Sequence, residues 1–137
     1  MAIGITLKAP LSVSTIDGHY KMLTDYPEAV KQNLKMLLLT APGERIMSPS
    51  YGVGLRNYLF ELAGSDFRNI LYLAISNQIK THLPYVVVDN ILVNDSISTQ
   101  GIYNTLSDNM VEIVISYNIR TFNNYRDTLT ITVNNTN

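Results

Sequence analysis

Residues 110–133 of the chain read MVEIVISYNIRTFNNYRDTLTITV. Apolar and polar side chains alternate along residues 110–120, so that the odd-numbered residues from 111 to 119 share one face. The same period continues in residues 127–133, where threonines alternate with Leu129, Ile131 and Val133. Between the two runs lies the turn candidate Asn123-Asn124-Tyr125. This stretch predicts a C-terminal β-hairpin with one apolar face.

The residues before the hairpin have the period of helices. In residues 25–40, apolar side chains recur at helical spacing, at Val30, Leu34, Leu37 and Leu38. A short helix is expected over residues 55–62, and a longer one is capped by Ser65 and continues toward Pro84. The apolar positions expected on its buried face are Phe67, Ile70, Leu71, Ala74, Ile75 and Ile79.

After Pro84 the period changes to that of strands, with a strand over residues 85–93 and a polar loop over residues 94–109. Helices followed by strands indicate an α+β fold, in which helices pack on one face of a small, mostly antiparallel β-sheet that ends in the C-terminal hairpin.

The first helix has a recognisable start. In Asp25-Tyr26-Pro27-Glu28, the Asp25 carboxylate is expected to accept the N–H of Glu28 while Glu28 reaches back, with Pro27 tolerated in the first turn. Upstream, Ile3, Ile5 and Leu7 alternate with polar residues and predict a short strand followed by a loop. We therefore expect an N-terminal extension over residues 1–24 and a single domain over residues 25–137.

Composition excludes several classes of protein. The 137 residues contain no cysteine, which removes disulfide scaffolds, thiolate metal sites and cysteine nucleophiles. Ten Lys and Arg against eleven Asp and Glu give a formal charge of -1, and the basic residues are scattered, which argues against binding to nucleic acid. The N-terminus lacks a basic signal-type region, and no apolar run reaches transmembrane length. The sequence predicts a soluble chain without nucleic-acid or membrane partners.

No catalytic, cofactor-binding or metal site is predicted. His19 and His82 are too few for a metal with three or four protein ligands, and Gly52-Val53-Gly54 is an isolated G-x-G without a βα unit before it. Glu44, Glu61 and Asp66 could supply a glycosidase pair, but ordinary ion-pair or solvated roles explain them better. We expect a protein that is not an enzyme and needs no cofactor.

Residues 40–61 read TAPGERIMSPSYGVGLRNYLFE. This stretch resembles the contractile-tail baseplate wedge family of phages, also called sheath initiators and found in related injection systems. The matching residues are Thr40, Gly43, Arg45, Pro49, Gly52, Leu55, Leu59, Phe60 and Glu61. The order of helices and strands extends the similarity over about residues 25–133.

The resemblance implies a structural protein of the virion tail baseplate, assembled in the host cytoplasm. The partners that it implies are other baseplate wedge proteins, the tail sheath protein, and tail tube or hub proteins. Members usually carry Glu-Pro-Arg after the long helix, whereas this chain has Leu83-Pro84-Tyr85 and keeps only Pro84. Contacts of that charged pair are therefore not carried over. The family is sometimes labelled lysozyme-like, which makes a peptidoglycan hydrolase an alternative, and a generic interaction module is a second one.

The motif is expected to have structural roles. Gly43, Gly52 and Gly54 set the path of the backbone between the first two helices. Arg45, which follows Glu44, is expected to bind a carboxylate or the carbonyl groups at a helix C-terminus. The residues expected to pack inward are Leu55, Leu59 and Phe60.

The last strand is the candidate surface for the sheath. It has no interior Lys or Pro to protect an edge, and an incoming strand would satisfy its open N–H and C=O groups. The residues assigned to this surface are Asp127, Thr128, Leu129, Thr130, Ile131, Thr132 and Val133. The alternative is that residues 1–10 of the same chain cover this edge.

Overall fold

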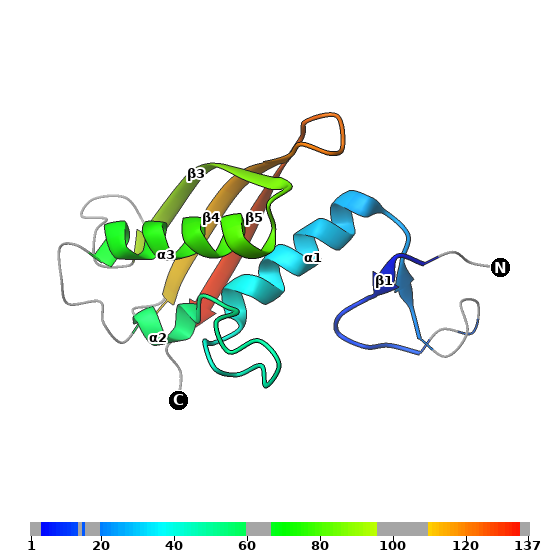
Figure 1. Ribbon diagram of the computed structural model, residues 1–137, viewed down its shortest axis with the longest axis horizontal. Coiled ribbons are helices and arrows are strands. Elements are labelled where there is room, and N and C mark those ends of the chain that lie inside the picture. The colour runs from blue at the N-terminus through cyan, green and yellow to red at the C-terminus, as the bar shows by residue number, and fades with distance from the viewer. Residues whose placement is uncertain (1–3, 14, 16–19, 60–66, 96–109, 135–137) are drawn as a thin grey trace.

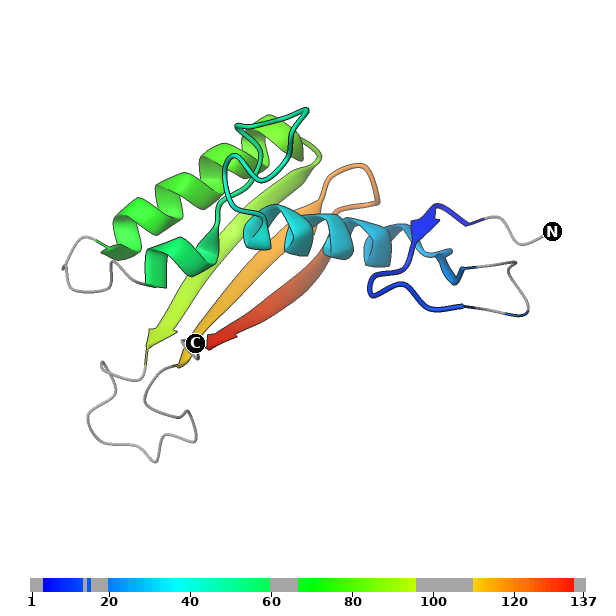
Figure 2. The same cartoon turned by 90° about the horizontal axis from the view of Figure 1, so that it is seen from below.

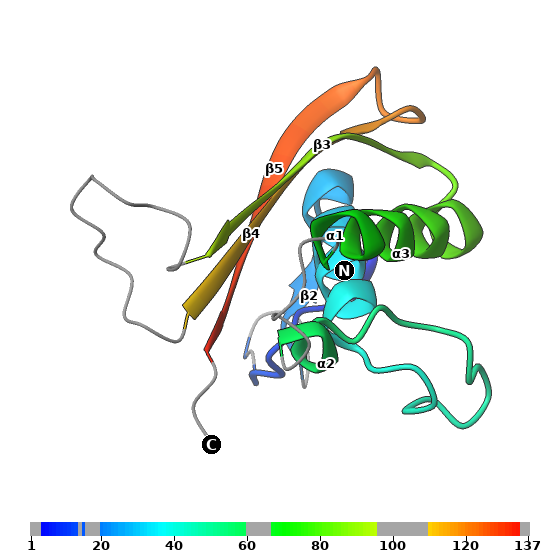
Figure 3. The same cartoon turned by 90° about the vertical axis from the view of Figure 1, so that its left-hand side faces the viewer.

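The computed structural model describes residues 4–13, 15, 20–59, 67–95 and 110–134 of the chain. In chain order its elements are β1 (Thr6–Leu7), β2 (Met22–Leu23), α1 (Tyr26–Leu39), α2 (Leu55–Leu59), α3 (Phe67–His82), β3 (Val86–Asp95), β4 (Met110–Ile119) and β5 (Tyr125–Asn134). Helices α1 and α3 lie on one face of the sheet formed by β3, β4 and β5 (Figures 1 and 3). The predicted α+β fold is confirmed.

The three-stranded sheet is antiparallel in the order β3-β4-β5. In its centre, Ile113 of β4 lies opposite Val93 on one side and Ile131 on the other. The turn between β4 and β5 contains Asn123 and Asn124 at φ angles of 51° and 52°, the left-handed region that asparagine tolerates. The predicted C-terminal hairpin is confirmed, and the strand predicted over residues 85–93 forms β3. Of the predicted loop over residues 94–109, Asn94 and Asp95 extend β3 and the rest lies outside the described residues.

The core lies between the sheet and the helices. The alternating face of β4 is buried from Val111 to Ile119, and Leu129, Ile131 and Val133 of β5 are each 4% exposed. The helices contribute most of the remaining side chains, among them Val30, Leu34, Leu37, Leu38, Leu71, Ile75 and Ile79. Each fully buried side chain of this kind stabilises the fold by about 1.5 to 3 kcal/mol. The predicted core of both hairpin strands and of α1 is confirmed.

One predicted core position in α3 is wrong. Ile70 is 52% exposed, whereas its neighbour Leu71 is completely buried. The buried stripe of α3 follows Leu71, Ile75 and Ile79, at intervals of four residues, and successive helical residues are about 100° apart. Ile70 therefore lies on the flank of the stripe. The side chain of Phe67 lies outside the described residues.

The start of α1 differs from the predicted capping box. Asp25 occupies the N-cap position, but its side chain makes no capping hydrogen bond, and Pro27 lies in the first turn. Because proline has no N–H, one of the backbone donors that such a carboxylate normally accepts is absent. Glu28 points instead to Lys8, whose Nζ lies 3.8 Å from its Oε1.

The N-terminal arm, which comprises the described residues before Asp25, contains a two-stranded ribbon. β1 pairs antiparallel with β2, with Thr6 opposite Leu23, so the predicted short strand has a partner strand that the sequence reading missed. The Gln32 side chain of α1 accepts the N–H of Ala9 at 2.9 Å and donates to the carbonyl of Leu7 at 2.8 Å. These bonds attach the arm to α1, on the β5 side of the sheet (Figures 1 and 2).

Candidate functional site

The free edge of β5 is the first candidate site. Among the residues that the structure describes, β5 pairs only with β4. β1 pairs with β2 and not with β5, so the described part of residues 1–10 does not pair with this edge as a strand, although Lys8 and Ala9 line a crevice together with Leu129 and Thr130. Leu129, Ile131 and Val133 are buried in the core, while Thr128, Thr130 and Thr132 are exposed on the opposite face. A partner at this edge would therefore meet main-chain groups and threonines.

One hydrogen bond determines which N–H groups of β5 point outward. The N–H of Arg120 donates to the carbonyl of Tyr85 at 3.1 Å, and successive residues of an antiparallel strand pair toward opposite sides. Even-numbered residues of β4 therefore pair toward β3, and odd-numbered ones pair toward β5. Because Ile113 lies opposite Ile131, the N–H of Ile131 points inward to β4 and the N–H of Thr130 points outward.

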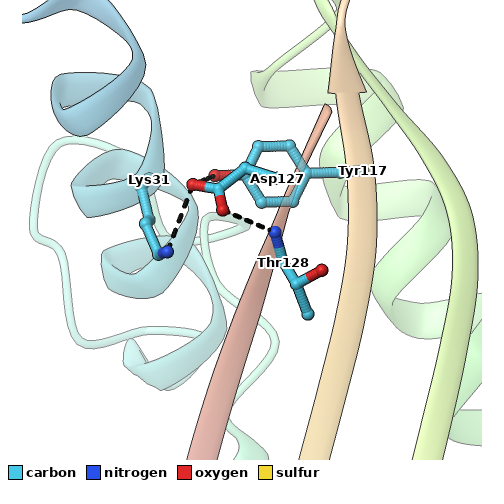
Figure 4. A network of polar contacts seen from close by, with 4 residues as sticks. All are labelled: Lys31, Tyr117, Asp127 and Thr128. Atoms are coloured by element: carbon cyan, nitrogen blue, oxygen red, sulfur yellow. Dashed lines mark hydrogen bonds and ion pairs between the residues drawn. The ribbon is translucent and has the colours of Figure 1, made fainter. Parts of the chain in front are cut away.

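The carboxylate of Asp127 accepts three hydrogen bonds at one end of this edge. Its Oδ1 accepts the outward N–H of Thr128 at 2.7 Å, and its Oδ2 accepts from Lys31 Nζ at 3.1 Å and from the Tyr117 hydroxyl at 3.4 Å (Figure 4). Burial, together with the negative charge of Asp127, raises the pKa of the Tyr117 hydroxyl. The network links α1, β4 and β5, and it leaves Thr130 and Thr132 as the central outward donors.

The opposite edge of the sheet is built differently. β3 has a bulge between Val88 and Asn90, which leaves Asp89 outside the regular pairing. Asp89 is exposed and accepts from Asn118 Nδ2 at 3.1 Å, and Arg126 Nε lies 3.9 Å from its other oxygen. A bulge with a charged side chain is a common protection of an edge strand, whereas β5 pairs with β4 without a register shift. β5 is therefore the more suitable edge for accepting another strand.

Residues 40–54 of the motif form the connection between α1 and α2, and its glycines have the predicted backbone role. Gly43, Gly52 and Gly54 all have positive φ angles, of 87°, 110° and 67°. A Cβ atom at Gly52 would collide with the carbonyl oxygen of Thr40. That same oxygen accepts the N–H of Gly54 at 2.9 Å, so the chain returns directly onto the C-terminal end of α1.

Hydrogen bonds within the connection between α1 and α2 hold it in a closed loop. Gly43 N–H donates to the carbonyl of Pro49 at 2.8 Å, and the Oε2 of Glu44 accepts the N–H of Ala41 at 2.9 Å. Leu55, the first residue of α2, is 1% exposed, as predicted. The side chain of Leu59 and all of Phe60 and Glu61 lie outside the described residues.

The predicted partner of Arg45 is wrong. Its guanidinium carbon lies 3.9 Å from the centroid of the Tyr51 ring, a cation–π contact, instead of binding a carboxylate or helix carbonyls. The closed loop brings Tyr51 back beneath Arg45, and the edge of Tyr51 in turn meets His82, with ring centroids 4.9 Å apart. Arg45 thus fixes the loop to the end of α3.

Gln78 of α3 is a residue that the sequence reading missed. Its Oε1 accepts the N–H of Gly52 at 3.1 Å, and its Nε2 donates to the carbonyl of Ser50 at 2.9 Å. A single polar residue beside the buried Ile79 carries no signal of this role in the sequence. In the fold it joins the motif to α3.

The residues that replace the family's charged triplet have apolar surroundings. Leu83 is 6% exposed and belongs to the core, and Pro84 is exposed in the turn between α3 and β3. Tyr85 packs against the core, and burial raises the pKa of its hydroxyl, which also bonds Asn33. A charged side chain in place of Leu83 in this structure would lose its hydration.

Within the described ranges there is no cluster of three His, Asp or Glu side chains able to hold a metal. In the same part of the chain, no helix has the length and hydropathy required to cross a bilayer. An exposed sheet edge of this kind can accept an additional strand from a partner protein.

Comparison with known families assigns the chain. The baseplate wedge protein gp25 family matches the chain over residues 24–124, and the chain belongs to this family. It is therefore a component of a phage-like tail baseplate, and the predicted resemblance is confirmed. The matched residues begin at the last residue of the arm and end in the turn before β5.

Two solved structures share the fold. A "putative tail lysozyme" from Geobacter sulfurreducens superimposes with a TM-score of 0.67 at 18% identity, over 85% of this chain and 97% of the other. A chain of the anti-feeding prophage baseplate, a cryo-EM structure, gives a TM-score of 0.63 at 23% identity, over 83% of both chains. Comparison with curated protein sequences finds no match.

Proposed function

We propose that this baseplate component initiates assembly of the tail sheath by strand addition to β5. The observation that carries the proposal is the bulge-free edge of β5, whose outward donors at Thr130 and Thr132 have no paired strand among the described residues. An incoming strand would satisfy these groups and extend the sheet to four strands. The threonine face requires little desolvation of charge when a neighbour packs on it.

The remaining assignments follow from this role. The chain acts in the virion tail baseplate, after assembly in the host cytoplasm. Its partners there are other baseplate wedge proteins, the sheath protein, and tail tube or hub proteins. The domain of residues 25–137 carries the shared fold, and the extension of residues 1–24 adds the arm that lies beside β5. The solved baseplate with the same fold supports this setting.

A pair of proline substitutions tests strand addition. Thr130→Pro removes an outward N–H, so the monomer should fold while assembled baseplates fail to start sheath polymerisation. Ile131→Pro removes an inward N–H and should destabilise the hairpin itself, because a hydrogen bond between β5 and β4 is lost. If the Thr130→Pro protein is incorporated into baseplates and still seeds sheath, strand addition at β5 is wrong.

A peptidoglycan assay tests the hydrolase alternative. The Glu44 carboxylate accepts the N–H of Ala41, and the other two candidates for a carboxylate pair, Glu61 and Asp66, both lie outside the described ranges. We expect no cleavage of peptidoglycan by purified protein. Cleavage that is lost in Glu44→Gln or Glu61→Gln would overturn the structural role.

A further inference from the structure

A crevice with an excess of positive charge lies beside the open edge of β5. It has a volume of about 330 Å³ and lies where α1, the arm and β5 meet. The lining residues that matter here are Lys8, Glu28, Lys31, Lys35, Leu129 and Thr130, and we name this site the basic crevice. Because Leu129 and Thr130 line it, the basic crevice borders β5. Figures 1 and 2 both place the arm on the β5 side of the sheet.

The charges of the basic crevice are only partly neutralised. Lys31 is paired with Asp127 at 3.1 Å, and Lys8 is 3.8 Å from Glu28, a long contact between exposed groups. Lys35 is exposed and makes no ion pair with any residue that the structure describes. Glu28, Lys31 and Lys35 follow one another at helical spacing on α1, so the surplus charge is concentrated along one line.

The register of an added strand places one of its side chains in this crevice. A new strand would lie about 4.8 Å from β5, and residues directly opposite each other in a sheet point to the same face. Leu129 points to the helix side, so the residue opposite Leu129 would do so too. The basic crevice is lined by Leu129 and Thr130 of β5 together with the lysines of α1 and the arm.

We propose that the strand accepted by β5 carries an aspartate or glutamate opposite Leu129, which binds in the basic crevice against Lys35 and Lys8. This inference rests on the proposed strand addition and adds the chemistry of the partner. The hydrogen bonds of the edge supply main-chain affinity, and the acidic side chain selects the partner strand and its register.

Synthetic strand peptides test the proposal on the full chain. Three peptides with alternating valine and threonine differ only at one central valine-face position, which is Glu, Gln or Lys. A fourth carries the Glu on the threonine face. Fluorescence anisotropy measures the affinity of each peptide, and hydrogen exchange at the amides of Thr130 and Thr132 reports strand addition separately.

We expect the valine-face Glu peptide to bind about five-fold more tightly than the Lys peptide at low salt, with a smaller ratio at high salt. Lys35→Glu should abolish or invert this preference. The control Lys80→Glu makes the same change of charge on α3, away from β5, and should preserve it.

The outcomes separate the two proposals. If the peptides protect Thr130 and Thr132 but bind with equal affinity, or if Lys35→Glu leaves the preference unchanged, the acidic partner is wrong while strand addition stands. If the threonine-face Glu peptide binds as tightly as the valine-face one, the basic crevice is not the binding site. If no peptide binds or protects these amides, strand addition and the acidic partner are both contradicted.

Discussion

The Nζ of Lys31 lies 3.1 Å from Oδ2 of Asp127, which joins the first long helix to the last strand across 96 positions of sequence. The same carboxylate accepts from the Tyr117 hydroxyl and the Thr128 N–H. α1 is thereby held on the sheet at the edge that we propose for strand addition.

Asp127→Ala should lower the free energy of unfolding by about 1 to 3 kcal/mol, because three donors lose their acceptor in a partly buried site. Urea denaturation of the purified chain measures this loss. Asp89→Ala is the matched control, since Asp89 is an exposed carboxylate with partners on the outer face of the same sheet. Its loss should stay within about 0.5 kcal/mol. Equal losses in both variants would contradict the structural role of the network.

Alkaline pH should reveal the buried hydroxyl of Tyr117. Burial and the charge of Asp127 raise its pKa above the ordinary value of 10.0, so the unfolded chain releases this proton at lower pH than the folded chain does. The contribution of this hydroxyl to the free energy of unfolding should therefore be complete below pH 10, and it should fall as the pH rises above that value. In Tyr117→Phe the fall should be less steep, by up to about 1.4 kcal/mol per pH unit, with Tyr85 contributing to the slope that remains. Identical slopes in urea titrations of the two proteins would show that this hydroxyl does not contribute.

Gly52 and Gly43 allow a paired test of the motif. Both have positive φ angles, but a Cβ at Gly52 meets the Thr40 carbonyl, whereas a Cβ at Gly43 has open space within 4 Å. Gly43→Ala should cost about 1 kcal/mol from its backbone conformation alone. Gly52→Ala should cost at least about 2 kcal/mol more, because the backbone must move away from α1. Thermal and urea unfolding of both variants give the difference, and similar losses would mean that the close approach at Thr40 is not required.

Gln78→Ala should destabilise the chain by about 1 to 3 kcal/mol, since it leaves the N–H of the buried Gly52 without its acceptor. Asn77→Ala, on the exposed side of the same helix, is the control for the change in helix propensity, and it should have little effect. Urea unfolding compares the two variants. A loss no larger in Gln78→Ala than in Asn77→Ala would show that the link between α3 and the motif is dispensable.

The regular elements could be predicted from the order of residues alone. The alternation in β4 and β5 and the helical spacing of Val30, Leu34 and Leu37 are local patterns, and each marks one apolar face that must be buried. The turn at Asn123 and Asn124 and the positive φ angles of the motif glycines also follow from local backbone chemistry. These local patterns predict the core, the hairpin and the path of the backbone in the family motif.

Only the tertiary structure decided which side chains meet across the fold. Arg45 stacks on Tyr51 because the closed loop returns there, and Gln78 bonds Gly52 across 26 positions of sequence. Likewise, β1 pairs with β2 and no described strand pairs with the outer edge of β5, and the packing of α1 beside that edge brought Lys31 to Asp127. The stabilisation gained by burying a side chain is roughly proportional to its apolar area and does not depend on the orientation of its neighbours. A periodic pattern of apolar residues is therefore enough to identify the face that must be buried. A polar contact depends on the distance and angle between two particular atoms, and these are determined only when the packed elements bring distant parts of the chain together.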